Sequence, residues 1–325
     1  MKNDIVDKLL EANDPAVRLK TLIQLFDFEY ESKEVQGILV NLDNSSVIQN
    51  LLSSLRNNNQ TDDVHVYKKW WGDHWSLSLL ADMKYPSNKK EILPNIEREF
   101  NWLLSEDHWN KRPTIKNRKR FCASQEGNGL FAALSLSECD ERCDFIADRL
   151  IKHQWPDGGW NCDRNPDTHN SSYHESLIPL RALNLYAQIK NNTNIKTLVE
   201  KSSELFLKRK LFRKMSDNSI IDERWLLLTY PPYWHYDIFT ALKVLAEIEK
   251  INDKRCNEAL EILESKRLLN GGFPKEYKYC QSKNPNRTYY SPVDWGGTNT
   301  KTMHEWITID ALYILKKAKR IDINY

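Results

Sequence analysis

Short polar clusters recur along the chain, and four of the five contain a histidine beside or near a carboxylate. The clusters are Asp73-His74, Gln125-Glu126, His174-Glu175, His235-Tyr236-Asp237 and His304-Glu305. A carboxylate beside an imidazole moves the histidine pKa across neutral pH, so such pairs suit general acid–base catalysis. Each cluster precedes an apolar helical segment, where an acidic residue can also serve as a cap for the unpaired amide groups. Capping does not call for histidine, so the set as a whole favours a chemical role.

We therefore expect acid–base chemistry from these clusters and from one acidic loop. The candidate catalytic residues are Glu126, Asp163, His174, Glu175, Asp237 and Glu305. Histidine and carboxylate side chains also bind zinc. The candidate zinc ligands are His235, Asp237 and His304, and zinc is the one cofactor that these residues suggest.

Aromatic residues gather around the same clusters. The candidate substrate-binding residues are Trp71, Trp160, Trp234, Tyr236, Tyr290, Trp295 and Trp306. Aromatic rings that line a cavity stabilise cations and hold flat apolar ligands. The alternative role for these side chains is packing between helices.

Two kinds of helical pattern alternate along the chain and must position these residues. Amphipathic, charged segments occupy residues 95–106, 142–154, 198–212 and 255–267, and more apolar segments occupy residues 73–84, 126–137, 174–190, 235–250 and 304–319. Charged helices suit an outer layer and apolar helices an inner layer. About six such pairs would form an all-α protein, an α/α toroid with almost no sheet. Its inner helices would run parallel, so that all the polar clusters lie at the same opening of the central cavity.

The chain is expected to form a single toroid domain over residues 1–325. Residues 1–60 contain a further helical pair at 3–11 and 15–28, with Pro15 in the first turn of its second helix. This segment is interpreted as an N-terminal helical cap that closes the ring, and residues 61–325 as the repeat core.

Composition narrows the function classes. Lys and Arg number 47 against 45 Asp and Glu, so no strongly basic surface for nucleic acid is expected. The sequence has no apolar run long enough to cross a bilayer and no secretory signal at its start, which predicts no transmembrane segment and a cytoplasmic location. The six cysteines contain no CxxC pair, so they indicate no disulfide scaffold.

Glycine pairs mark the turns between the outer and inner segments. Residues 154–160 read QWPDGGW and residues 268–273 read LLNGGF. QWPDGGW resembles the QxxDGGW repeat of squalene–hopene cyclases, oxidosqualene cyclases and protein prenyltransferase β subunits. The wider pattern, over most of residues 67–319, is similar to bacterial proteins described as prenyltransferase and squalene oxidase repeat proteins. The resemblance implies an α/α toroid with an apolar, isoprenoid-like small-molecule substrate in an aromatic-lined central cavity.

The chain departs from the named enzymes in its acid and metal motifs. It has no DxDD motif, which class II terpene cyclases use to protonate their substrate, and Asp62-Asp63 does not continue as the DDxxD motif of class I synthases. The zinc site of the prenyltransferase β subunits combines an Asp-x-Cys with a later histidine. This chain offers His235-x-Asp237 and His304 at comparable places, without the cysteine.

Three functions stay open on this sequence. The first is acid–base chemistry on an isoprenoid-like substrate, in the manner of a terpene cyclase or prenyltransferase. The second is a metal-assisted hydrolase, or a carbohydrate-active lyase or glycosidase, on the same barrel. The third is a non-catalytic ligand-binding protein, which predicts inner-helix polar residues that satisfy one another and a cavity smaller than usual ligand pockets.

Overall fold

The computed structural model describes residues 4–61, 64–280 and 289–325, and this part of the chain is mainly helical. Its helices of five or more residues are α1 (Asp4–Leu10), α2 (Pro15–Phe26), α3 (Lys33–Leu39), α4 (Ser46–Gln60), α5 (Asp73–Asp82), α6 (Leu93–Leu103), α7 (Glu106–Asn110), α8 (Ala123–Leu136), α9 (Glu141–Lys152), α10 (Tyr173–Ile189), α11 (Thr193–Leu207), α12 (Ile238–Glu247), α13 (Asn257–Ser265) and α14 (Glu305–Lys317). The only strands in these residues are the short pair β1 (Thr114–Ile115) and β2 (Arg118–Lys119). None of the described helices has the length and hydropathy of a membrane span.

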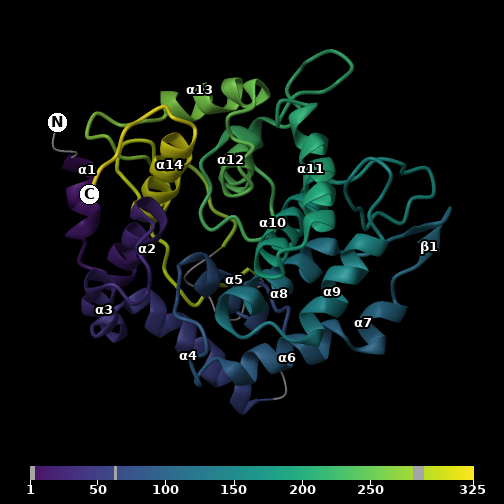
Figure 1. Ribbon diagram of the computed structural model, residues 1–325, viewed down its shortest axis with the longest axis horizontal. Coiled ribbons are helices and arrows are strands. Elements are labelled where there is room, and N and C mark those ends of the chain that lie inside the picture. Colours follow the sequence, from purple (N-terminus) through teal and green to yellow (C-terminus); the bar gives the residue numbers. More distant parts are fainter. Residues whose placement is uncertain (1–3, 62–63, 281–288) are drawn as a thin grey trace.

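Six helix pairs form a double ring (Figure 1). The inner helices are α2, α5, α8, α10, α12 and α14, and each is preceded by an outer partner: α1, α4, α6, α9, α11 and α13. Successive inner helices pack against one another from α5 round to α14 and on to α2. An ion pair of 2.8 Å between Lys20 of α2 and Asp82 of α5 closes the circle. The predicted all-α toroid is therefore confirmed.

The burial patterns explain why the apolar segments form the inner ring and the amphipathic segments the outer ring. Helix α8 is buried along its whole length apart from Ser135, because helices surround it on all sides. In the outer helix α9, only the side that carries Cys143, Ile146, Ala147, Arg149 and Leu150 is buried. Apolar segments therefore lie inside and amphipathic ones outside, as their hydrophobic periodicity predicts.

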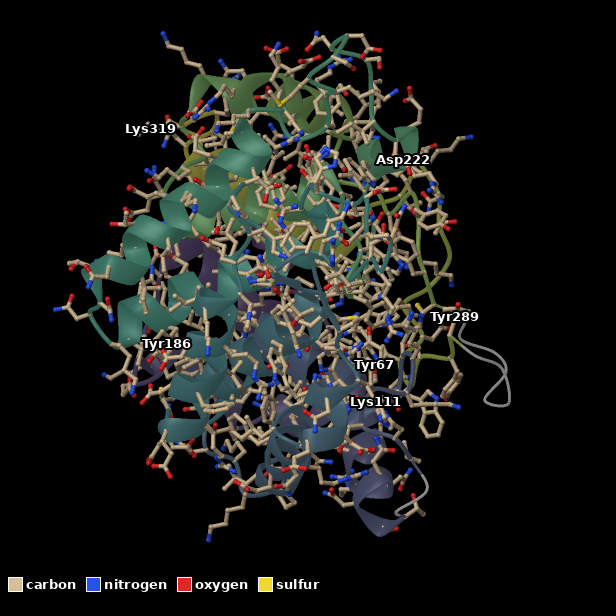
Figure 2. The ribbon with its side chains drawn as sticks, turned by 90° about the vertical axis from the view of Figure 1, so that its right-hand side faces the viewer. Tyr67, Lys111, Tyr186, Asp222, Tyr289 and Lys319 are labelled. Atoms are coloured by element: carbon tan, nitrogen blue, oxygen red, sulfur yellow. The ribbon has the colours of Figure 1, made fainter. Side chains whose placement is uncertain are left out.

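The inner helices run in the same direction. Figure 2 shows the ring from its edge, with Tyr67, Lys111, Asp222 and Tyr289 toward one side of the molecule. These residues come from segments that precede inner helices. Tyr186 and Lys319, at the ends of α10 and α14, lie toward the opposite side. We call the first side the N-terminal mouth and the second the C-terminal face.

Residues 4–60 form part of the ring. Helix α2 packs against α14, and α4 packs against α5 as its outer partner. The segment interpreted from the sequence as a cap thus contributes α2 to the inner ring. It joins the two ends of the repeat array.

Helices α8 and α10 approach each other closely because of one glycine. A Cβ atom at Gly127 of α8 would lie 2.7 Å from the backbone nitrogen of Pro179 in α10, which is too short for any side chain. Proline has no N–H, so it leaves no donor unpaired at this contact. The close packing brings the starts of α8 and α10 together at the N-terminal mouth.

Candidate functional site

The axis of the barrel is filled by charged side chains. We call this group the axial ion-pair network: Lys20, Asp82, Arg181, Lys243, Glu247 and Asp310. Asp82 accepts from Lys20, Lys243 and Arg181 at 2.8, 2.6 and 2.9 Å. Burial would raise the pKa of Asp82, but the three cations outweigh burial and hold this pKa well below its ordinary value. The network separates a central chamber from a pocket on the C-terminal face.

The central chamber has an aromatic wall but little room. Trp75, Phe131, Tyr230, Tyr233 and Phe239 contribute to its lining, and its volume is about 70 Å³. Ligand pockets for drug-sized molecules are roughly 300–1,000 Å³. The polar groups along the axis bind one another, and the chamber is too small for an isoprenoid chain.

Two cysteines and a glutamate come together at the N-terminal mouth. One potential ligand atom from each of Cys122, Cys162 and Glu175 lies within 4.8 Å of the other two. The Cys162 thiol donates to Glu175 Oε1 at 3.3 Å, and Glu175 Oε2 accepts the Ser124 N–H at 2.9 Å. In the described part of the chain, this is the only group of three His, Cys, Asp or Glu residues gathered so closely. We call it the Cys–Cys–Glu cluster.

The local fold explains why these three side chains meet. Cys122 is the residue before α8, and Glu175 lies in the first turn of α10. Cys162 follows the glycine turn that leads into α10, where Gly158 has a φ of 98° that a side chain rarely adopts. The close approach of α8 and α10 at Gly127 then brings Cys122 to the other two residues.

The electrostatics of the cluster shift the pKa values of its two thiols in opposite directions. A hydrogen bond between the cysteines lowers the pKa of Cys122 and raises that of Cys162. The Arg112 guanidinium lies 3.7 Å from Cys122 Sγ and donates to Gln125 Oε1 at 3.1 Å. Burial raises the pKa of Glu175. Glu175 is buried and both cysteines are partly exposed, so the cluster reaches solvent on its sulfur side.

The zinc ligands predicted from the sequence do not meet. His235, Asp237 and His304 form no group of three within the 4.8 Å that joins the Cys–Cys–Glu cluster. His235 stacks on Tyr279, and its Nδ1 lies 3.2 Å from the Pro232 carbonyl oxygen. The His304 ring lies against Tyr230 instead. The three side chains stay apart because the turns before α12 and α14 direct the imidazoles to different aromatic neighbours.

Burial controls the ionisation of these predicted ligands. It lowers the pKa of both His235 and His304 to about 3, so both are neutral at neutral pH. It raises the pKa of Asp237 to about 7, against hydrogen bonds from the Thr240 backbone that lower it. Asp237 Oδ1 caps α12 by accepting the Thr240 N–H at 2.6 Å, and Oδ2 is buried without a hydrogen-bond partner among the described residues.

Several other predicted residues share the N-terminal mouth in two groups. His174 accepts the Tyr236 N–H at 2.7 Å, and its ring lies 5.3 Å from Trp234, which stacks on His235. Burial lowers the pKa of His174. The second group lines an open hollow of about 340 Å³: Glu305, Trp295, Trp306 and His304. Burial raises the pKa of Glu305 there.

The remaining predicted residues lie apart from these groups. Glu126 is fully buried and binds Arg149 at 2.8 Å and His108 at 3.2 Å, so it joins α8 to α9 and α7. Asp163 lies in an exposed loop and accepts from Thr168 at 2.6 Å, a hydrogen bond that lowers its pKa. These three contacts give both acidic side chains a structural role.

Two of the predicted substrate-binding aromatics, Trp160 and Tyr236, have packing roles, and two others are placed by backbone hydrogen bonds. Trp160 is fully buried and donates through Nε1 to the Leu150 carbonyl at 2.9 Å, while Tyr236 donates to the Leu211 carbonyl at 2.6 Å. Trp71 accepts from Ser54 of α4 through its backbone carbonyl. Tyr290 is half-buried, and its carbonyl oxygen accepts the Trp70 N–H at 2.8 Å.

The two cysteines of the cluster were missed by reasoning from the sequence. They are forty positions apart, and metal-binding cysteines are usually recognised by short spacings. Position gave a signal for Cys122, which directly precedes the inner helix α8, but not for Cys162, which lies well before α10 begins at Tyr173. Counting cysteines together with histidines and carboxylates at the inner-helix starts would have found Cys122.

Comparisons with known proteins give a fold likeness. No family model matches the chain, and no curated protein matches its sequence. A structure of the type II terpene cyclase MstE from Scytonema, in complex with geranylgeranyl dihydroxybenzoate as substrate, is 13% identical. That alignment covers 98% of this chain and 96% of the cyclase, with a TM-score of 0.46. A second MstE structure, in complex with merosterolic acid A as product, is 14% identical over 84% of this chain and 96% of the cyclase, with a TM-score of 0.27.

At identities of 13% and 14%, neither alignment assigns a chemistry to this chain.

Proposed function

We propose that this protein is a zinc-dependent hydrolase whose site is the Cys–Cys–Glu cluster at the N-terminal mouth. The observation that supports the proposal is the approach of Cys122, Cys162 and Glu175 to within 4.8 Å. Thiolate and carboxylate are ligands that zinc prefers, and catalytic zinc sites typically combine three protein ligands with one open position.

The residues around the cluster have matching roles. Cys122 and Cys162 would hold the metal through sulfur and Glu175 through Oε1, while the Ser124 N–H fixes the other carboxylate oxygen. Arg112 lies beside the Cys122 sulfur, where its positive charge favours the thiolate form. Zinc in such a site lowers the pKa of a bound water toward neutrality and polarises a carbonyl or phosphoryl oxygen.

The solvent-facing side of the cluster suits a substrate that approaches from outside. Both cysteines are partly exposed, so the open ligand position can face the mouth. Arg112 is available nearby for an anionic group that develops during hydrolysis, since its guanidinium is held by Gln125 and Cys122 without a carboxylate partner among the described residues. This arrangement needs no large cavity on the axis.

Acid–base chemistry on an isoprenoid-like substrate in the centre of the barrel has less support. The central chamber measures about 70 Å³ and its floor consists of paired charges. Glu126 Oε1 is held by Arg149 and Asp163 by Thr168, and neither residue lines the chamber. The charged groups along the axis are paired with one another. A reaction that forms a carbocation in the chamber would have to break these ion pairs.

A test of the proposal measures zinc-dependent turnover. Zinc-loaded and chelator-treated protein would be assayed on chromogenic carboxylic esters, amides, phosphate esters and glycosides. We expect turnover of at least one class by the zinc-loaded protein, and a loss of at least about 100-fold in Cys122→Ser, since second-shell changes alone cost roughly 10–100-fold. Cys139→Ser is the matched control, because Cys139 is also a partly buried free thiol but lies outside the Cys–Cys–Glu cluster. Turnover that is equal with and without zinc, or unaffected by Cys122→Ser, would refute the proposal.

A further inference from the structure

The C-terminal face carries a second pocket, on the other side of the axial ion-pair network. Its volume is about 370 Å³, which lies within the range of small-molecule sites. All six inner helices or the residues directly after them contribute to its wall. The pocket therefore lies where the ring opens on the face opposite the Cys–Cys–Glu cluster. We call it the tyrosine pocket, after Tyr30, Tyr85 and Tyr313 in its wall.

The wall of the tyrosine pocket combines flat apolar surface with a few polar groups. Phe131, Leu134 and Leu185 complete the apolar part beside the tyrosines. Tyr30 and Tyr85 use their hydroxyl groups on the protein itself, donating to the Lys84 carbonyl at 2.9 Å and to Glu91 at 2.7 Å. Their rings remain as a fixed surface that an aromatic or aliphatic ligand can contact.

Lys84 is the cation of the pocket wall that has no partner among the described residues. Across the described residues, its ammonium has neither an ion pair within 4.0 Å nor a hydrogen bond, whereas its backbone is held by Tyr30 and Ala81. The neighbouring network is already balanced, because Lys20, Arg181 and Lys243 are paired with Asp82, Glu247 and Asp310. Lys84 therefore adds one positive charge that these carboxylates do not offset. Burial lowers its pKa, as expected for a cation removed from water.

A second polar atom of the pocket wall is also unsatisfied. Gln24 is 7% exposed, and its amide nitrogen donates to Asp310 at 2.8 Å, but its Oε1 has no donor in the described structure. Buried acceptors are usually paired, so this oxygen is an exception, although its residue belongs to the pocket wall. The one free carboxylate of the wall is Asp27, which lies exposed at the edge.

We propose that the tyrosine pocket binds a small organic carboxylate with an aromatic or aliphatic body. Its carboxylate pairs with Lys84, and its body contacts the tyrosine rings. A carboxylate is favoured over a neutral ligand because it supplies a negatively charged partner for the Lys84 ammonium. This site is separate from the proposed zinc site, since the axial ion-pair network lies between them.

Isothermal titration calorimetry on the full chain tests the proposal with matched probes. Indole-3-acetate, phenylacetate and hexanoate would be compared with their amides, and indole-3-acetate also with tryptamine. We expect at least one carboxylate to bind about tenfold or more tightly than its amide, as for a hydrogen bond to a charged group. Lys84→Met should remove this preference, and Lys84→Arg should retain most of it.

The controls separate this site from the zinc site. Cys122→Ser should leave the binding of the carboxylate unchanged, and the melting temperature of each variant shows that it is folded. The proposal is overturned if no carboxylate binds with a Kd below about 10 mM. It is also overturned if the amide or the amine binds as tightly as the acid, or if Lys84→Met keeps the preference.

Discussion

Replacing Asp82 by asparagine is expected to lower the free energy of unfolding by about 3–5 kcal/mol, the cost typical of breaking a buried ion pair from one side. Asp82 binds Lys20, Lys243 and Arg181, which come from α2, α12 and α10. The isosteric asparagine leaves the axial ion-pair network with one cation in excess. Three inner helices lose their common anion at the point where α2 closes the ring. Urea denaturation at pH 7 measures the effect.

Two further variants make this prediction specific. Asp107→Asn breaks an exposed ion pair with Lys111, and surface pairs contribute little to stability, so this variant should resemble the wild type. The double variant Asp82→Asn/Lys243→Met restores the charge balance and should be less destabilised than the sum of its single variants. A cost below about 1 kcal/mol for Asp82→Asn would contradict the importance assigned to the network.

Replacing Asp237 by asparagine is expected to stabilise the protein above neutral pH. Burial raises the pKa of Asp237 to about 7 in the folded state, from 3.8 in the unfolded chain. Between these values the folded state holds a proton that the unfolded state has lost, so the stability due to this group falls as pH rises from about 4 to 7. Asparagine cannot ionise, yet it can still cap α12 through its side-chain oxygen. We expect a gain of about 2–4 kcal/mol at pH 8 that disappears near pH 4.

A second capping aspartate provides the matched control. Asp222 caps the short 3-10 helix Glu223–Leu226, accepting the Arg224 N–H at 2.9 Å, but a hydrogen bond from Arg224 lowers its pKa. Asp222→Asn should therefore give no gain at high pH. Urea denaturation of both variants at pH 5 and pH 8 checks the pair. A difference between wild type and Asp237→Asn that does not change with pH would show that Asp237 ionises normally in the folded protein.

The helices were predictable because each depends on a local pattern. The apolar segment 174–190 became α10 (Tyr173–Ile189), and the charged segment 142–154 became α9 (Glu141–Lys152). A helix whose whole surface is apolar must be covered on all sides, so the inner and outer places followed as well. The glycine turns also behaved as expected, with Trp160 buried directly behind Gly159.

The site was less predictable because it depends on distances between segments. His235, Asp237 and His304 stand at inner-helix starts, as expected, but a helix start does not determine where an imidazole points. The Cys–Cys–Glu cluster arises from the close contact at Gly127 and the turn at Gly158, neither of which a count of spacings can show. The pairing of Lys20 with Asp82 and Asp310 likewise links residues that lie far apart in the sequence.

Zinc content is the most direct test of the central claim. Untagged protein would be purified without chelator, exposed to zinc, passed through a desalting column and analysed by plasma mass spectrometry. We expect about one zinc per chain in the wild type and in Cys139→Ser, and almost none in the folded double variant Cys122→Ser/Cys162→Ser. A folded wild-type protein that retains no zinc, or a double variant that retains as much as the wild type, would contradict it.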